Sequence, residues 1–125
     1  MAKIKFNLPS NLEEETTEYI NNVLSYLKKN DKLNVIDGGA LYMLADTYNT
    51  YIKASKQLAE EGLTVTSDRG NISQHPVYGI MKYSIATAMD ILRDFGLTLK
   101  SRSKLNIIDS ESEESPLMQF INSNN

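Results

Sequence analysis

The sequence predicts a mainly α-helical protein whose core is an antiparallel hairpin of two long central helices. Apolar residues recur at helical spacing in three segments, over residues 10–29, 34–61 and 76–95. Only the short polar stretch 62–75 joins the last two segments, so we expect them to be neighbours in space. An N-terminal helix, a short β-hairpin or loop between the central helices, and a short C-terminal helix complete the predicted fold.

The N-terminal helix is expected to begin at Ser10. Glu13 follows three residues later, which is the capping-box arrangement in which each side chain satisfies the other residue's backbone N–H. Three glutamates, Glu13–Glu15, then lie at the positive end of the helix dipole, and Lys28 and Lys29 lie at its negative end. Both ends of the segment 10–29 are therefore marked by their charges.

The second helix is expected over residues 34–61, with Asn34 or Asp37 as its cap. It carries a heptad-like seam of residues at alternating steps of three and four: Leu41, Leu44, Tyr48, Tyr51, Ser55 and Leu58. Small and apolar residues widen this seam, so the helix should pack on more than one neighbour. Gly62 ends it, because a residue without Cβ can take the left-handed conformation that closes a helix.

Residues 62–75 should turn the chain between the two central helices. Val65 and Ile72 flank the polar run 67–71, which includes Gly70 and is typical of a short hairpin or a compact loop. Pro76 opens the third helix, 76–95, because its missing N–H costs nothing at the first helical position. Gly96 closes that helix, and Thr98 can cap a short fourth helix, 98–105.

At 125 residues the chain is expected to form one helical domain over residues 1–105. Residues 106–125 carry four acids and no Lys or Arg, and we expect this tail to be disordered. Its apolar end is either a docking peptide or a lid that returns to its own domain, and the sequence leaves both open. The residues assigned to this docking role are Leu117, Met118, Phe120 and Ile121.

Several classes of function are disfavoured by what the sequence lacks. No apolar run approaches the ~20 residues that span a bilayer, so neither membrane insertion nor secretion is expected. The chain has no cysteine, and His75 is its single histidine, so a zinc site of the Cys/His kind cannot form within one subunit. His75 is expected to cap or pack, and no phosphate-binding fingerprint is present. We predict no catalytic residue, no metal and no cofactor.

The charge is unevenly distributed, although the net charge is −3. Residues 62–105 carry six Lys/Arg and three Asp, whereas residues 1–32 are neutral. Lys and Arg attract phosphate, and Ser hydroxyls can donate to its oxygens. The candidate nucleic-acid-binding residues are therefore Arg69, Lys100, Ser101, Arg102 and Lys104, although four cations among polar residues are more often an ordinary soluble surface. An alternative basic surface in the N-terminal region consists of Lys3, Lys5, Lys28, Lys29 and Lys32.

Two motifs in residues 34–105 resemble the small-subunit family of phage terminases. The family pattern reads G-L, a short variable loop, G-N-x-x-x-H-P, a helix, and L-G-L-T-P-x-x-R-x-x-L. The matching structural residues here are Gly62, Gly70, His75, Pro76 and Gly96. Leu99 stands where the family usually has proline, which leaves the start of the fourth helix less fixed. Phe95 replaces the common leucine.

The resemblance implies a DNA-recognition component of a genome-packaging motor, which is not an enzyme. Such proteins are mainly helical and assemble into homo-oligomeric rings. They bind double-stranded viral DNA and hand it to a large subunit that holds the ATPase and the nuclease, in the host cytoplasm. The competing interpretation is a helical oligomeric adaptor that binds only protein partners.

Overall fold

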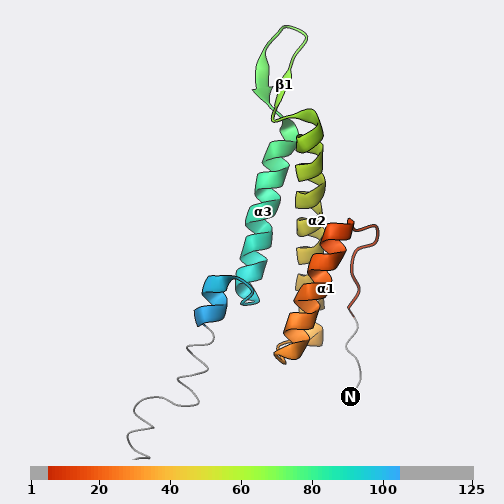
Figure 1. Cartoon of the computed structure of the whole chain (residues 1–125), viewed down its shortest axis with the longest axis vertical. Helices are drawn as coiled ribbons and strands as arrows, with labels where there is room; N and C mark the ends of the chain where they lie inside the picture. The colour runs from red at the N-terminus through yellow and green to blue at the C-terminus, as the bar shows by residue number, and fades with distance from the viewer. Residues whose placement is uncertain (1–5, 105–125) are drawn as a thin grey trace, which may run out of the picture. The chain divides into compact units, whose positions relative to one another are not determined.

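The computed structural model describes residues 6–104, and the chain divides between Ile91 and Leu92 into two compact units. A further helical turn follows at 99–104 in the second unit. The mainly helical class is confirmed, as are the hairpin between the central helices and the short C-terminal helix. Figure 1 shows the elements, which are α1 (Glu14–Lys29), the 3-10 turn η1 (Val35–Asp37), α2 (Gly38–Glu61), β1 (Thr64–Thr66), β2 (Ile72–Gln74) and α3 (Pro76–Asp94).

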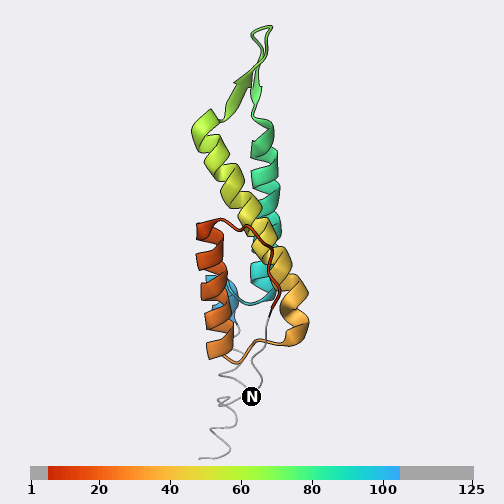
Figure 2. The same ribbon diagram turned by 90° about the vertical axis from the view of Figure 1, so that its right-hand side faces the viewer.

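The core of the first unit lies where α1 packs against α2, and both views show the two helices side by side (Figures 1 and 2). Tyr19 of α1 stacks on Tyr48 of α2 with ring centroids 4.4 Å apart. Apolar side chains of both helices are buried against each other here. This burial is the main source of stability for the two helices. The fully buried apolar residues of this unit include Ile20, Leu27, Leu41, Leu44 and Ala45.

The predicted start of the first helix is wrong. The helix begins at Glu14, and Ser10 does not cap it, since Asn11 has a left-handed backbone with φ 60°. The backbone N–H of Glu13, which the capping box would have satisfied locally, donates instead to Oδ1 of Asn49 in α2 at 2.8 Å. A contact between distant residues therefore replaces the local cap.

Lys56 of α2 holds the same end of α1. Its Nζ lies 2.6 Å from Oε2 of Glu15 and 3.3 Å from Oε2 of Glu13. The hydrogen bond from Lys56 lowers the pKa of the Glu15 carboxyl, and the same bond raises the pKa of the Lys56 ammonium. The first turn of α1 is thus tied to α2 by charge.

Replacing Lys56 with methionine should lower the free energy of unfolding at neutral pH and have less effect in acid. The pKa of Glu15 is lower in the folded chain, so its contribution is present above the unfolded value and lost as the pH falls through the folded value. The contribution of Lys56 is present below its unfolded pKa and lost as the pH rises through its raised folded pKa. Urea unfolding of parent and variant at pH 7 and pH 3 measures the difference.

Lys53→Met is the matched control, because Lys53 is an exposed lysine on the same helix. A pH dependence that is the same for both variants would show that the Lys56 contacts do not stabilise the fold.

Thr16 is a buried polar residue in the first turn of α1. Its side chain is fully buried, and its hydroxyl oxygen has no hydrogen-bond partner within residues 6–104. A buried hydroxyl without a partner destabilises a fold, because it has lost its hydrogen bonds to water.

Replacing Thr16 with valine should therefore raise the free energy of unfolding by about 1 kcal/mol. Valine keeps both branches of the side chain and removes the polar atom. Thr16→Ser, which keeps the hydroxyl and removes the methyl group, should be destabilising instead. Denaturant unfolding of the three chains compares them, and a valine variant less stable than the serine variant would contradict this account of Thr16.

Asn34, one of the two predicted caps, caps the 3-10 turn η1 that precedes α2. Its Oδ1 accepts from the N–H of Ile36 at 3.0 Å, and its own N–H donates to Oδ2 of Asp37 at 3.1 Å. This reciprocal pair closes η1, and α2 continues from Gly38 without a side-chain cap from Asp37.

The stretch between α2 and α3 is a β-hairpin rather than an irregular loop. Gly62 ends α2 with φ 85°, and its N–H donates to the carbonyl oxygen of Leu58 at 2.8 Å. β1 and β2 then pair antiparallel, with Val65 opposite Ser73. α2 runs toward the hairpin and α3 runs away from it, so the two helices lie antiparallel on the same side of the hairpin (Figures 1 and 2).

Candidate nucleic-acid interface

The second unit begins with the end of α3, which is closed by its backbone. The N–H of Leu97 donates to the carbonyl oxygen of Leu92 at 2.8 Å, and the N–H of Gly96 donates to that of Arg93 at 3.0 Å. These two bonds form a Schellman motif, which requires a left-handed residue; Gly96 supplies it with φ 69°. The predicted role of Gly96 is confirmed.

Thr98 starts the short C-terminal helix, 99–104. Its Oγ1 accepts from the N–H of Ser101 at 3.1 Å, and Oγ of Ser101 accepts from the N–H of Thr98 at 3.1 Å. The capping role of Thr98 is confirmed, and Ser101 completes a reciprocal cap. The hydroxyl of Ser101 is thus engaged within the chain, and its contact with DNA stays a prediction.

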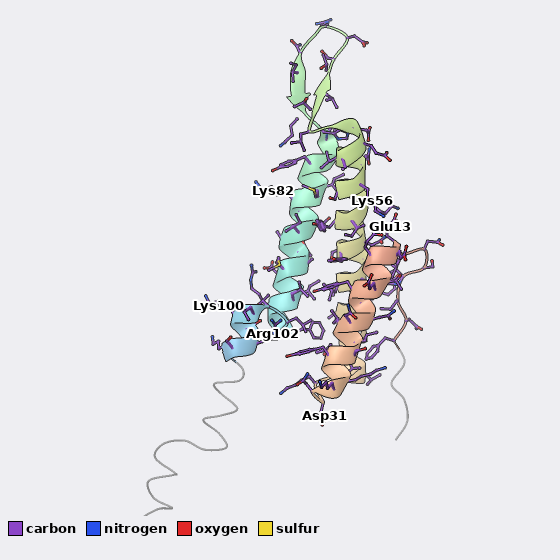
Figure 3. The ribbon with its side chains drawn as sticks, in the orientation of Figure 1. Glu13, Asp31, Lys56, Lys82, Lys100 and Arg102 are labelled. Atoms are coloured by element: carbon purple, nitrogen blue, oxygen red, sulfur yellow. The ribbon has the colours of Figure 1, made fainter. Side chains whose placement is uncertain are left out.

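The three cations of this helix are not equivalent. Nη1 of Arg102 donates to the carbonyl oxygen of Leu97 at 2.6 Å, so its half-buried side chain stabilises the junction with α3. Lys100 and Lys104 are exposed, and a separation of four residues places them on one face of the helix. Figure 3 shows the side chains of Lys100 and Arg102. Lys100 and Lys104 together form what we call the C-terminal lysine pair.

Arg69 lies in the first unit, at the tip of the β-hairpin. The N–H of Ser67 donates to the carbonyl oxygen of Asn71 at 2.8 Å. The N–H of Gly70 donates to the carbonyl oxygen of Ser67 at 2.9 Å. This is a three-residue turn whose last residue, Gly70, has φ 85°. Arg69 is exposed there beside Asp68, which offsets its charge locally.

His75 joins the ends of α2 and α3. Its Nδ1 accepts from the N–H of Val77 in the first turn of α3 at 3.0 Å, and its Nε2 faces Oε1 of Glu61 at 3.6 Å. The side chain is buried, and its backbone N–H donates to the carbonyl oxygen of Leu63 at 2.8 Å. Both ring nitrogens thus have structural contacts, as the expected capping role requires. Pro76 begins α3 as predicted.

A model of the family described as "Phage terminase, small subunit" matches residues 18–112. The match covers most of the chain and spans both motifs. The chain belongs to this family. No curated protein and no solved structure matched it.

Membership of the terminase small-subunit family indicates a role in phage DNA packaging, in a class that is generally regulatory or DNA-binding rather than catalytic. No cluster of three or more His, Asp or Glu side chains that could hold a metal ion occurs in residues 6–104. No helix in the same part of the chain is long and apolar enough to cross a membrane.

Other basic residues of this small-subunit family member also lie at the surface. Lys28 and Lys29 are exposed in the last turn of α1, and Lys32 is exposed just after it. Lys82, which the sequence did not single out, is exposed on α3, and Figure 3 labels it. Its position in the sequence, on the helix face opposite Ser84 and Ala88, could have indicated that Lys82 is exposed. Lys3, Lys5 and the tail residues 117–121 lie outside the described part of the chain.

Proposed function

We propose that this chain binds double-stranded viral DNA in the host cytoplasm and presents it to the terminase large subunit, which carries the ATPase and nuclease. The family match supports the packaging role. The C-terminal lysine pair carries the DNA-binding part of the proposal, because both ammonium groups are exposed on one helical face. Arg69 at the hairpin tip and Arg102, through its remaining N–H groups, are further candidate phosphate contacts.

We further propose that the chain acts as a homo-oligomeric ring. α3 supports this, because its buried residues are only the small side chains of Ser84 and Ala88. Larger apolar side chains on the same helix are exposed: Tyr83 by 77%, Ile80 by 52% and Ile85 by 40%. A helix this apolar on its outside fits a contact with another subunit. Repeated copies would also strengthen a weak basic surface by avidity.

The proposal predicts a steep salt dependence of DNA binding that the lysine pair helps to set. Replacing both Lys100 and Lys104 with alanine should weaken binding and flatten the plot of log affinity against log salt by about 1.8 per bound chain, since each phosphate contact contributes about 0.9. Fluorescence anisotropy with a labelled duplex from the phage packaging region, at several salt concentrations, measures both quantities.

Lys53→Ala is the control, because it removes an exposed lysine of α2 instead. An unchanged slope in the double variant would remove the lysine pair from the interface. Absence of salt-dependent DNA binding by the parent chain would favour the protein-only adaptor, whose apolar contacts respond little to salt.

A further inference from the structure

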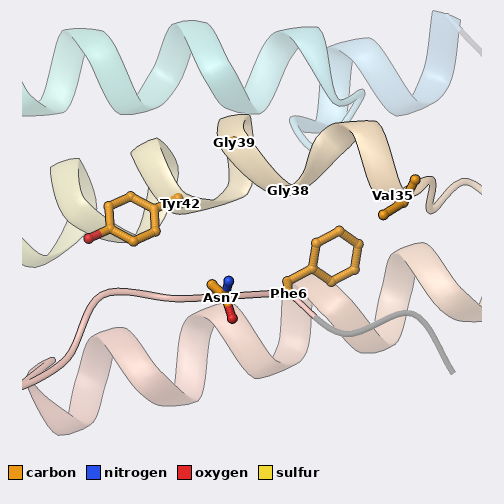
Figure 4. Close-up of a pocket in the computed structure, with 6 residues that line it drawn as sticks. All are labelled: Phe6, Asn7, Val35, Gly38, Gly39 and Tyr42. Atoms are coloured by element: carbon orange, nitrogen blue, oxygen red, sulfur yellow. The ribbon is translucent and has the colours of Figure 1, made fainter.

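A groove opens beside the first turn of α2, between this helix and the segment that precedes α1 (Figure 4). Its volume is about 340 Å³. One end of it is apolar and uncovered within the described residues, since Val35 is 70% exposed and its neighbour Ile36 is 84% exposed. The residues that line the groove are Phe6, Asn7, Val35, Gly38, Gly39 and Tyr42.

Two contacts determine the course of residues 6–13 along α2. At one end, a Cβ on Gly38 would lie only 3.1 Å from Cδ1 of Phe6, so the Phe6 ring lies directly against the helix. At the other end, the N–H of Glu13 donates to Oδ1 of Asn49 at 2.8 Å. The segment and α2 therefore run in the same direction between these two anchors.

Followed backwards, the same course leads to the apolar end of the groove. Figure 4 shows Asn7 on the Tyr42 side of the groove and Phe6 on the Val35 side. The residues before Phe6 are attached at this point, so they enter the space beside Val35 if they keep the direction of residues 6 and 7.

The spacing of the anchors gives the level that Ile4 would reach. Between the anchors the segment advances by seven residues while α2 advances by eleven. Eleven helical residues rise about 16.5 Å, which is about 2.4 Å per residue of the segment, and a fully extended chain advances about 3.4 Å per residue. Ile4, two residues before Phe6, is thus expected about 5–7 Å beyond Gly38. Val35 lies three residues before Gly38, or about 6 Å at the rise of a 3-10 turn.

The residues before Phe6 also have the pattern of an extended segment with one apolar side. Ala2, Ile4 and Phe6 alternate with Lys3 and Lys5. Alternate residues of an extended chain point to the same side. An extended continuation therefore gives Ile4 the side on which Phe6 meets α2, and gives the two lysines the side toward water.

We propose that Ile4 of the same chain binds over Val35 and Ile36 and closes the apolar end of the groove. Residues 1–5 are covalently attached to Phe6, so they meet this patch at high effective concentration and lose less translational freedom on binding than a separate partner would. The patch is then covered within one chain. The exposed face of α3 is left as the apolar surface that is available to another subunit.

Disulfide formation within one chain tests the proposal, and the natural absence of cysteine leaves no background. A full-length chain that carries Ile4→Cys and Val35→Cys should lose both free thiols under mild oxidation and still run as a monomer on a non-reducing denaturing gel. Lys5→Cys with Val35→Cys is the matched control, because Lys5 is nearer to Phe6 along the chain but falls on the opposite side. We expect disulfide formation in the control to be at least fivefold slower.

Trypsin cleavage between Lys3 and Ile4, followed by mass spectrometry, gives a second measurement without cysteines. A docked segment resists the protease, because cleavage requires it to detach first. Val35→Asp should raise the cleavage rate at least fivefold, since a carboxylate at the apolar end disfavours burial of Ile4. Met43→Asp is the control, because it adds the same charge at an exposed residue of α2 that does not line the groove. Circular dichroism checks that both variants stay helical.

Equal rates of disulfide formation from Ile4→Cys and Lys5→Cys would overturn the docking of Ile4. So would a cleavage rate that Val35→Asp and Met43→Asp change equally. A cross-linked dimer from a mixture of Ile4→Cys chains and Val35→Cys chains, in place of the disulfide within one chain, would assign the groove to a second copy and overturn docking within one chain. None of these results depends on DNA, so the proposed function is tested separately.

Discussion

Replacing Leu44 with alanine should destabilise the chain by about 3 kcal/mol. Leu44 lies in α2 and is fully buried. Truncating a buried leucine loses the free energy of transferring its methyl groups from water and leaves a cavity, and such changes cost about 2–5 kcal/mol. Urea unfolding followed by circular dichroism at 222 nm, at one fixed protein concentration, measures the loss.

The neighbouring residue supplies the control for Leu44. Met43 lies on the same helix and is 56% exposed, so Met43→Ala should change the free energy of unfolding by less than about 1 kcal/mol. If the two alanine variants were equally stable, the core would not lie where α1 packs on α2.

Replacing His75 with alanine should destabilise the chain by about 2 kcal/mol. The change removes the acceptor that caps the N–H of Val77 and leaves that donor at the start of α3 without its partner. It also removes the imidazole that faces Glu61 at the end of α2. Thermal unfolding by calorimetry, with parent and variant compared at the same concentration, measures the effect.

His75→Asn separates capping from the other contacts of this side chain. Asparagine is among the best residues for capping a helix start, so it should restore about 1 kcal/mol relative to alanine. The backbone bond from residue 75 to Leu63 is available to all three chains. An asparagine variant no more stable than the alanine variant would assign the stability to packing and to Glu61 rather than to the cap.

The features that sequence predicted well depend on contacts within a few residues. Gly62 and Gly96 end their helices through bonds to the preceding turn, and Pro76 starts α3 because of its own ring. Thr98 caps through Ser101, three residues away. Such signals act locally, so they can be recognised without knowing the fold.

Features that depend on distant contacts were missed or misassigned. The start of α1 is set by Asn49 and Lys56 of α2, which are more than thirty residues from Glu13 in the sequence. These contacts override the local capping-box pattern at Ser10. At the candidate interface, sequence identified the cations but could not rank them. The bond from Arg102 to the carbonyl oxygen of Leu97 spans only five residues, but it depends on the backbone course of the turn between them, which the spacing of the cations does not reveal.

The three-residue turn of the β-hairpin limits how this part of the chain can change in length. Successive strand residues point to opposite faces, and Val65 opposite Ser73 fixes which face each side chain takes. One inserted residue in a strand would shift the register and exchange the two faces of everything beyond it, as far as His75. Inserting one residue in each strand, at paired positions, would preserve both the turn and the contact between His75 and Glu61. The hairpin can therefore become longer by even numbers while the helices it joins stay as they are.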